Sequence, residues 1–401
     1  MNAVQMMNLL IILFIAVMVM NNLWRSVRIT SDATSIGLET ESAVLLKNYR
    51  GPKIWNNASV LTTSKPRQEY SIDTKLIGVY TPKCTSQLTS STPEPDWLSR
   101  FPYLALIGAM KGGTKALRSY LGEHPTIATS CGPADNGKEI HFFDIRAALT
   151  DQLNRTELQQ AYAVRLEKVC QVSVEAIKAD LNLVFMDDSP MYLFYSHKVP
   201  QTMLCTVPWT KLVAILRNPV ERAFSHFVFK YEKCTGKTFE EWIDIEFHLM
   251  ERAGLLALAD GHDSVGELDA WKKYHSAPEM QFKGKQKHTA QCSSFVGRGL
   301  YAIQLQHWFA ALSAFGRPTT DLMVLSTDSL REQTLQSTYN KLLDFLDLDP
   351  HQLKQVSSVH STNYNNKPIL KPETRKRLED FYRPYNQRLY KLLCWDTSPW
   401  A

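Results

Sequence analysis

The 401-residue chain lacks several patterns that would point to a particular class of function. Its seven cysteines form no CxxC pair and no cluster with histidine, which argues against a structural zinc site. Charged residues make up only 21% of the chain and the net charge is +5, far from the charge density of a dedicated nucleic-acid-binding protein. Internal repeats and low-complexity tracts are also absent. We therefore expect no metal and no nucleic acid as partner, and the mildly basic balance suits an enzyme with anionic ligands.

The first residues predict a membrane anchor. From Ala3 to Trp24 the chain runs for about 20 residues without a charge, close to the span of a bilayer core. A cleaved signal peptide is the alternative, but no small-x-small cleavage site follows the apolar run. Two arginines after the span would by themselves place the rest of the chain in the cytosol. Glycosylation sequons at Asn57 and Asn154 favour the opposite, so we expect a single-pass type II protein with a lumenal catalytic part.

Composition divides the chain into three parts. We assign 1–24 to a cytosolic tip and transmembrane signal anchor, 25–97 to a stem, and 98–401 to the catalytic domain, because 25–97 is rich in Ser, Thr, Asn and Pro without a sustained period. In an oxidising lumen seven cysteines allow up to three disulfides and one leftover thiol. The pairing is not encoded in the spacing; our guess is Cys234 with Cys292.

The catalytic part alternates short apolar runs with helical stretches. The apolar runs lie at 103–108, 183–187, 211–217 and 321–326. The helical stretches lie at 114–122, 220–231, 301–315, 333–346 and 372–393, and a further helix is expected after Phe239. Nearly continuous apolar strands followed by helices are typical of a buried parallel sheet with helices on both faces. The pattern thus predicts one α/β domain with a central parallel sheet.

A glycine-containing loop follows the first strand. Lys111, Gly112, Gly113 and Thr114 stand where the strand gives way to a helix. Glycines let the backbone wrap around an anion, and the N–H groups of the first helical turn point at it. The lysine precedes the glycine pair, so the loop is not the GxxxxGK[ST] loop of nucleotide triphosphatases. We interpret it as a phosphate site; the alternative is an ordinary strand-to-helix turn.

A second polar turn follows the strand at 211–217. Arg217 ends the strand, and Pro219 stands near the first position of the next helix, where proline is favoured. Arg217 and Ser225 could converge on one phosphate, through a bidentate guanidinium and a donated hydroxyl. Arg222 is either part of this site or a solvated helix residue. The alternative for the whole turn is a capped helix without a ligand.

The motifs GxxKGGTxxL and RNPxxRxxSxxxF together resemble the sulfotransferases that use 3′-phosphoadenosine 5′-phosphosulfate (PAPS). The likeness is greatest to the Golgi membrane-bound glycosaminoglycan branch, which includes the heparan sulfate enzymes, and covers about residues 101–395. It implies a P-loop-like α/β fold, PAPS as co-substrate and a glycan acceptor. By resemblance, Lys111, Gly112, Gly113 and Thr114 hold the 5′-phosphosulfate, with Lys115 beside them. Arg217 and Ser225 hold the 3′-phosphate.

The resemblance also implies a catalytic base. A Glu-x-His-Phe-Phe-Asp stretch supplies it in the heparan sulfate enzymes, and Glu139 carries that role over. A sugar hydroxyl is a poor nucleophile and must lose its proton as the new bond forms. Lys111 would neutralise charge on the departing phosphate. His141 is expected to orient the acceptor or the sulfuryl oxygens, or else to pack beside the aromatic pair, and Asp144 to orient groups near Glu139 or to cap a helix.

The chain departs from the family pattern after the second strand. Asp188 stands where the heparan sulfate enzymes carry a lysine near the sulfuryl group, so Lys138 or Lys115 is expected to substitute. Asp187 and Asp188 are expected to cap the next helix or, alternatively, to bind the acceptor.

Three later residues resemble family contacts with the nucleotide. Arg298 and Tyr301 are expected near the 3′-phosphate or adenine, with core packing the alternative for Tyr301. Lys367 lies in a segment that resembles the loop closing over the cofactor, without its bounding cysteines.

Three other functions remain open from the sequence: a P-loop kinase, a catalytically silent glycan-binding protein with the same fold, and a tyrosine-sulfating enzyme. The missing GK[ST] argues against a kinase, and the EIHFFD stretch favours a carbohydrate acceptor by resemblance. The modified sugar and the oligomeric state are not encoded in any recognisable pattern.

Overall fold

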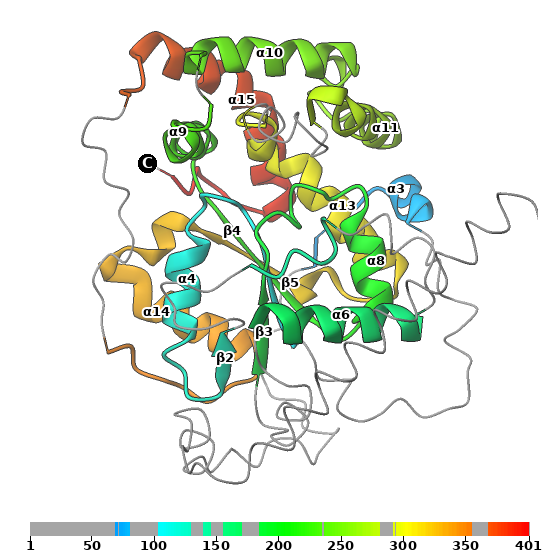
Figure 1. Cartoon of the computed structure of the whole chain (residues 1–401), viewed down its shortest axis with the longest axis vertical. Helices are drawn as coiled ribbons and strands as arrows, with labels where there is room; N and C mark the ends of the chain where they lie inside the picture. The colour runs from blue at the N-terminus through cyan, green and yellow to red at the C-terminus, as the bar shows by residue number, and fades with distance from the viewer. Residues whose placement is uncertain are drawn as a thin grey trace, which may run out of the picture. The chain divides into compact units, whose positions relative to one another are not determined.

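Five parallel strands form the centre of the fold, in the order β2–β3–β1–β4–β5 (Figure 1). Their bounds are Leu104–Gly108 for β1, Ile127–Thr129 for β2, Val184–Asp188 for β3, Lys211–Leu216 for β4 and Leu322–Ser326 for β5. The computed structural model describes residues 69–70, 72–80, 103–129, 139–145, 155–170, 184–234, 236–280, 292, 294–354 and 368–400. All of them belong to one unit, Leu61–Ala401.

Helices connect the strands and surround the sheet. The α-helices are α3 (Thr74–Val79), α4 (Thr114–Leu121), α6 (Arg155–Cys170), α8 (Val199–Thr206), α9 (Pro219–Lys230), α10 (Phe239–Arg252), α11 (Ser264–Ser276), α13 (Tyr301–Ala314), α14 (Glu332–Phe345) and α15 (Pro372–Leu393). Short 3-10 helices lie at Leu256–Leu258, Pro278–Met280, Gly297–Gly299, Thr319–Asp321 and Thr327–Leu330.

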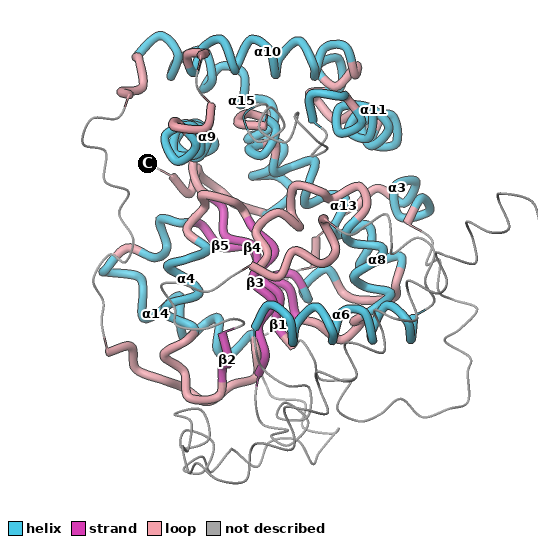
Figure 2. The backbone as a smooth tube through the Cα atoms, in the orientation of Figure 1, coloured by secondary structure: helices cyan, strands magenta, loops and turns pink. Residues whose placement is uncertain are grey.

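Each face of the sheet packs against its own set of helices (Figure 2). Successive side chains of β1 alternate between the faces, as the two-residue period of a strand requires. Leu104 and Leu106 join a core cluster with α4 and α14. Ala105 and Ile107 join the larger cluster with α6, α8 and α13. Both faces are buried, which explains why β1 and β4 are nearly continuous apolar runs and why β3 is apolar up to the two aspartates at its end.

The predicted parallel α/β sheet is confirmed, and every strand and helix predicted for the catalytic part is present within one or two residues of its expected ends. The strand β2 and the helices α3, α6, α8 and α11 were not predicted.

Part of the range assigned to a stem packs on this core. Helix α3 contacts α11 and α13, and its Leu76 is buried. The Tyr80 hydroxyl donates a hydrogen bond to the carbonyl of Ser196 over 3.0 Å, and the Ser264 hydroxyl donates one to Asp73 over 2.6 Å. Residues 72–80, within the range assigned to the stem, therefore pack against the α/β core.

The predicted Cys234–Cys292 disulfide is confirmed, with 5.7 Å between its Cα atoms. Cys205 is disulfide-bonded as well. Within the described ranges, no helix has both the length and the apolar character needed to cross a membrane. The expected anchor at 1–24, both sequon asparagines, Lys138 and Lys367 lie outside the described residues.

Candidate active site

The first loop wraps tightly at the end of β1. Gly113 precedes α4 with φ of 106°, a left-handed conformation that glycine adopts without strain. At Gly112 a Cβ atom would lie 2.5 Å from the carbonyl oxygen of Ile215 on β4, so only glycine fits there. The glycine pair therefore lets the loop approach the neighbouring strand while α4 presents its N-terminus at the edge of the sheet.

Positive charge gathers around the apex of this loop. The Nζ atom of Lys111 lies 4.5 Å from the centroid of the Phe229 ring. Burial, and then the charges of Lys115, Arg217 and other basic groups, lower the pKa of Lys111 to about 8. Repulsion among these positive charges lowers the stability of the folded protein, and a bound anion would remove that repulsion. The arrangement therefore suits an anionic ligand.

The second loop opens α9 beside the first. The Asn218 side chain accepts a hydrogen bond from the N–H of Val220 over 3.0 Å and caps the helix, with Pro219 at its first position. Ser225 is 2% exposed, and its hydroxyl has no hydrogen-bond partner among the described residues. A buried hydroxyl of this kind is expected to bond a ligand or an ordered water.

Hydrogen bonds join the two loops. The N–H of Ala109 donates to the carbonyl of Ile215 over 2.8 Å. Arg222 donates to the carbonyl of Met110 over 3.4 Å. The Thr327 hydroxyl donates to the carbonyl of Gly112 and, over 3.0 Å, to that of Leu216. The loops end neighbouring strands, β1 and β4, and a single ligand could reach both.

Arg222 is not a solvated helix residue. Its side chain is fully buried, and it also donates to the carbonyl of Phe295. It therefore holds the first loop against α9 rather than facing solvent.

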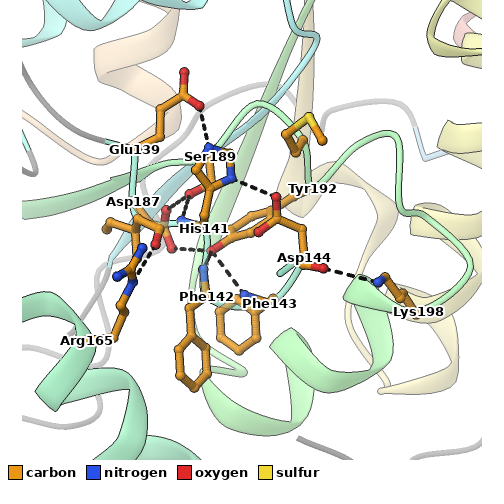
Figure 3. A network of polar contacts seen from close by, with 12 residues as sticks. Glu139, His141, Phe142, Phe143, Asp144, Arg165, Asp187, Ser189, Tyr192 and Lys198 are labelled. Carbon is orange, nitrogen blue, oxygen red and sulfur yellow. Dashed lines mark hydrogen bonds and ion pairs between the residues drawn. The ribbon is translucent and has the colours of Figure 1, made fainter. Parts of the chain in front are cut away.

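Two carboxylates, of Glu139 and Asp144, flank the imidazole of His141 in a row (Figure 3). The Nε2 atom of His141 lies 2.7 Å from Oε2 of Glu139, and its Nδ1 atom lies 2.7 Å from Oδ2 of Asp144. Burial alone would lower the pKa of His141, but the hydrogen bonds to Asp144 and Glu139 raise it to about 10. The imidazole is thus a cation held between two anions, and Asp144 orients the imidazole.

The backbone at His141 is pinned from β3. His141 has φ of 50°, in the left-handed region, and its N–H donates to the Ser189 hydroxyl over 3.0 Å. That hydroxyl donates to Asp187 over 2.7 Å, and Asp187 also accepts from Tyr162 and Tyr192 over 2.7 and 3.1 Å. The expected helix-capping role of Asp187 is therefore wrong, because its carboxylate organises the loop that carries His141.

Asp188 does not cap a helix either. It is 2% exposed, and its Oδ2 atom lies 3.4 Å from Nη1 of Arg118 on α4. The next helix, α8, begins only at Val199.

Glu139 lies within electrostatic range of the first loop's surroundings. Burial and the charges of Lys233 and Arg298 lower the pKa of Lys230 overall, whereas the charge of Glu139 raises it. The Lys230 and Lys111 ammonium groups contact the same Phe229 ring. The carboxylate row and the cation-lined loops thus border one another.

The later candidates lie deeper in the fold. Tyr301 is buried, and its hydroxyl donates to the carbonyl of Arg217 over 2.9 Å. Arg298 is buried too, 4.3 Å from the Phe194 ring, and donates to the Ser294 hydroxyl over 2.9 Å. Tyr301 therefore contacts the second loop through the backbone carbonyl of Arg217. Lys115, the remaining candidate near the first loop, is exposed on α4.

Sequence reasoning missed Thr327, Lys230 and Arg118. A signal for Thr327 exists, since it directly follows β5 and the carboxyl ends of parallel strands meet at one edge of the sheet.

The family comparison decides the class of protein. A model described as a sulfotransferase domain matches residues 102–378. The chain belongs to the PAPS-dependent sulfotransferase family. The P-loop kinase alternative is thereby set aside.

Curated relatives of this sulfotransferase include enzymes named for heparan sulfate. It is 25% identical over 315 residues to heparan sulfate glucosamine 3-O-sulfotransferase 6 of Homo sapiens, covering 73% of this chain and 72% of that protein. It is 24% identical over 358 residues to the membrane-associated sulfotransferase kil1 of Dictyostelium discoideum, covering 78% and 69%. Among solved structures, a sulfotransferase from Alicyclobacillus acidocaldarius matches with 23% identity and a TM-score of 0.47, over 75% of this chain and 98% of that one.

Proposed function

We propose that this sulfotransferase transfers a sulfuryl group from PAPS to a carbohydrate hydroxyl. The observation that carries the proposal is the meeting of two cation-lined loops, at the ends of the neighbouring strands β1 and β4, beside a row of carboxylates. A nucleotide with anionic groups at both its 3′ and 5′ positions is the kind of ligand that matches two such loops.

The residues present fit that nucleotide. The unpartnered Ser225 hydroxyl and the partly exposed Arg217 would bind the 3′-phosphate. The glycine pair and the Thr114 end of α4 would receive the 5′ end, since a side chain at Gly112 would clash with β4. Burial and then the neighbouring positive charges lower the pKa of Lys111, and an anion at this end would offset both effects.

The carboxylate row supplies the proton acceptor. PAPS brings an activated sulfuryl group, bonded through oxygen to its 5′-phosphate. Glu139 takes the proton of the acceptor hydroxyl as that oxygen bonds to sulfur. His141, bonded to both Glu139 and Asp144, holds the carboxylate in place. Lys111 stabilises the charge that the phosphate oxygen gains as its bond to sulfur breaks. Positioning and electrostatics then carry most of the catalysis, as in phosphoryl transfer.

A glycan acceptor and a lumenal location complete the proposal. The names of the relatives refer to heparan sulfate, which is a glycan. The Cys234–Cys292 disulfide supports an oxidising compartment, because disulfides are rare in the cytosol. We place the enzyme in the Golgi membrane, held by the N-terminal apolar segment as a type II protein.

The test uses the full chain in detergent, labelled PAPS and a panel of glycans beside a tyrosine peptide. We expect label on at least one glycan, with release of adenosine 3′,5′-bisphosphate. Glycan binding without any transfer by the wild-type enzyme would contradict the proposal and favour a silent binding protein. Label on the peptide alone would refute the glycan acceptor.

A further inference from the structure

Arg118 is a buried arginine whose hydrogen-bonding capacity is only partly used. It lies on α4 one turn after Thr114 and is 2% exposed. Among the described residues, the acidic group that it contacts is Asp188, whose Oδ2 atom lies 3.4 Å from its Nη1 atom. Its Nε and Nη2 atoms have no hydrogen-bond partner in the part of the chain that the structure describes, and the same holds for Oδ1 of Asp188.

A purely structural ion pair would be built differently. Arginine and carboxylate groups in a dry interior usually meet through two parallel hydrogen bonds, which satisfy the donors of the fork and both acceptor oxygens. Here the pair meets through one long contact. Buried donors left without a protein partner are a sign of a missing ligand or water.

The pair borders the site of the proposed chemistry. Asp188 ends β3 and lies beside Leu106 of β1, the strand that leads into the first loop. Burial and then the charge of Glu139 raise the pKa of Asp188 to about 7, against the lowering effect of Arg118. Asp188 thus lies within electrostatic range of the proposed base, and the ion pair holds the Arg118 guanidinium beside Asp188.

We propose that Arg118 is a catalytic residue that binds the sulfuryl oxygens with its unpartnered N–H groups, and that Asp188 is a positioning residue that holds it there. The proposal rests on the proposed function. It also accounts for the departure at Asp188: the positive charge that the resembling enzymes carry after this strand comes here from the neighbouring helix. During transfer, Arg118 stabilises charge on the sulfuryl oxygens while Glu139 takes the proton.

Two double variants of the full chain test this. Arg118→Leu with Asp188→Leu removes both charges and leaves neither partner unpaired, so the fold should hold. Arg118→Leu with Asp188→Lys returns one positive charge to the same buried position, from the strand instead of the helix. We expect kcat to fall about 100-fold in the first and to recover at least about 10-fold in the second. Both should bind adenosine 3′,5′-bisphosphate, which has no sulfuryl group, within about threefold of wild type.

Arg118→Lys gives an independent measurement that does not depend on the double variants folding. It keeps the charge but loses the planar fork. We expect weaker discrimination between PAPS and adenosine 3′,5′-bisphosphate in binding, together with a lower kcat and an unchanged KM for the glycan.

Wild-type turnover in the double leucine variant, or unchanged discrimination in Arg118→Lys, would overturn the inference while leaving the proposed function intact. A folded Asp188→Lys double variant no faster than the leucine pair would also overturn it. Failure of the wild-type enzyme to transfer sulfate would instead refute the proposed function, and with it the inference about Arg118.

Discussion

The Nε2 atom of His141 lies 2.7 Å from Oε2 of Glu139, and its Nδ1 atom lies 2.7 Å from Oδ2 of Asp144. Glu139 is therefore not a carboxylate swinging freely at the surface. It is the outer end of a charge-alternating row whose inner end, Asp144, is buried and also accepts, through its backbone carbonyl, a 3.1 Å hydrogen bond from Lys198. The row fixes the direction in which Glu139 can accept a proton.

Glu139→Gln should abolish most sulfate transfer. The amide keeps the shape of the side chain but cannot accept a proton, and general-base catalysis typically contributes about 10²- to 10⁴-fold. We expect kcat to fall by at least about 100-fold while nucleotide affinity stays within about threefold. Glu332→Gln, at an exposed position of α14, is the matched control and should leave the rate unchanged. A wild-type rate in Glu139→Gln would remove this residue from the mechanism.

The ion pairs of His141 should make stability depend on pH in one direction. The folded pKa is raised from 6.5 to about 10, so the native state holds the proton more tightly than the unfolded state. The stabilising effect is complete below pH 6.5 and is lost as the pH rises toward 10. The free energy of unfolding of wild type minus that of His141→Gln, from urea titrations at pH 6, 8 and 10, should shrink at each step. A constant or growing difference would contradict the ion-paired imidazolium.

Lys111→Met should stabilise the nucleotide-free enzyme while impairing function. Burial and neighbouring cations lower the folded pKa of Lys111 to about 8, so the charged group costs stability most below pH 8 and least near pH 10.5. We expect a higher melting temperature at pH 7 than in wild type, with weaker binding of adenosine 3′,5′-bisphosphate and slower turnover. The gain should fade between pH 8 and 10.5.

The exposed Lys341→Met on α14 controls for loss of a positive charge in general. An equal rise in melting temperature in this variant, or none in Lys111→Met, would argue against a strained cation cluster.

Helix α3 should be required for a stable catalytic domain. Leu76→Ala removes a buried side chain from the core, and such changes cost about 2–5 kcal/mol. Lys75→Ala, on the exposed side of the same helix, should cost little. Urea denaturation of the two variants decides the matter. Equal stability would mean that α3 only rests on the domain, and a soluble fragment starting at residue 98 would then suffice.

The sequence was sufficient to predict the parts of the site that depend on local pattern. Strands buried on both faces leave continuous apolar runs, and their polar ends in Lys111 and Arg217 mark one edge of a parallel sheet. Because β1 and β4 are neighbours in the sheet, the loops that follow them lie side by side.

Contacts between distant segments were beyond such reasoning. Thr327, which is distant in the sequence, donates a hydrogen bond to the carbonyl of Gly112. In sequence Arg222 looks like any helical arginine, and only the fold brings it to the carbonyls of Phe295 and Met110. Helix α3 is only six residues long, too short to show an amphipathic period. Its burial comes from packing on α11 and α13, which no local pattern of residues 72–80 encodes.

The 3′-phosphate contact of Ser225 gives the most direct test of the central claim that two loops grip one nucleotide. We would measure by calorimetry the affinity of wild type and Ser225→Ala for adenosine 3′,5′-bisphosphate and for adenosine 5′-monophosphate. The variant loses no internal hydrogen bond within the described structure, so its melting temperature should match wild type. Affinity for the bisphosphate should fall about 10-fold, and affinity for the monophosphate should not change. An equal loss for both nucleotides, or for neither, would contradict the account.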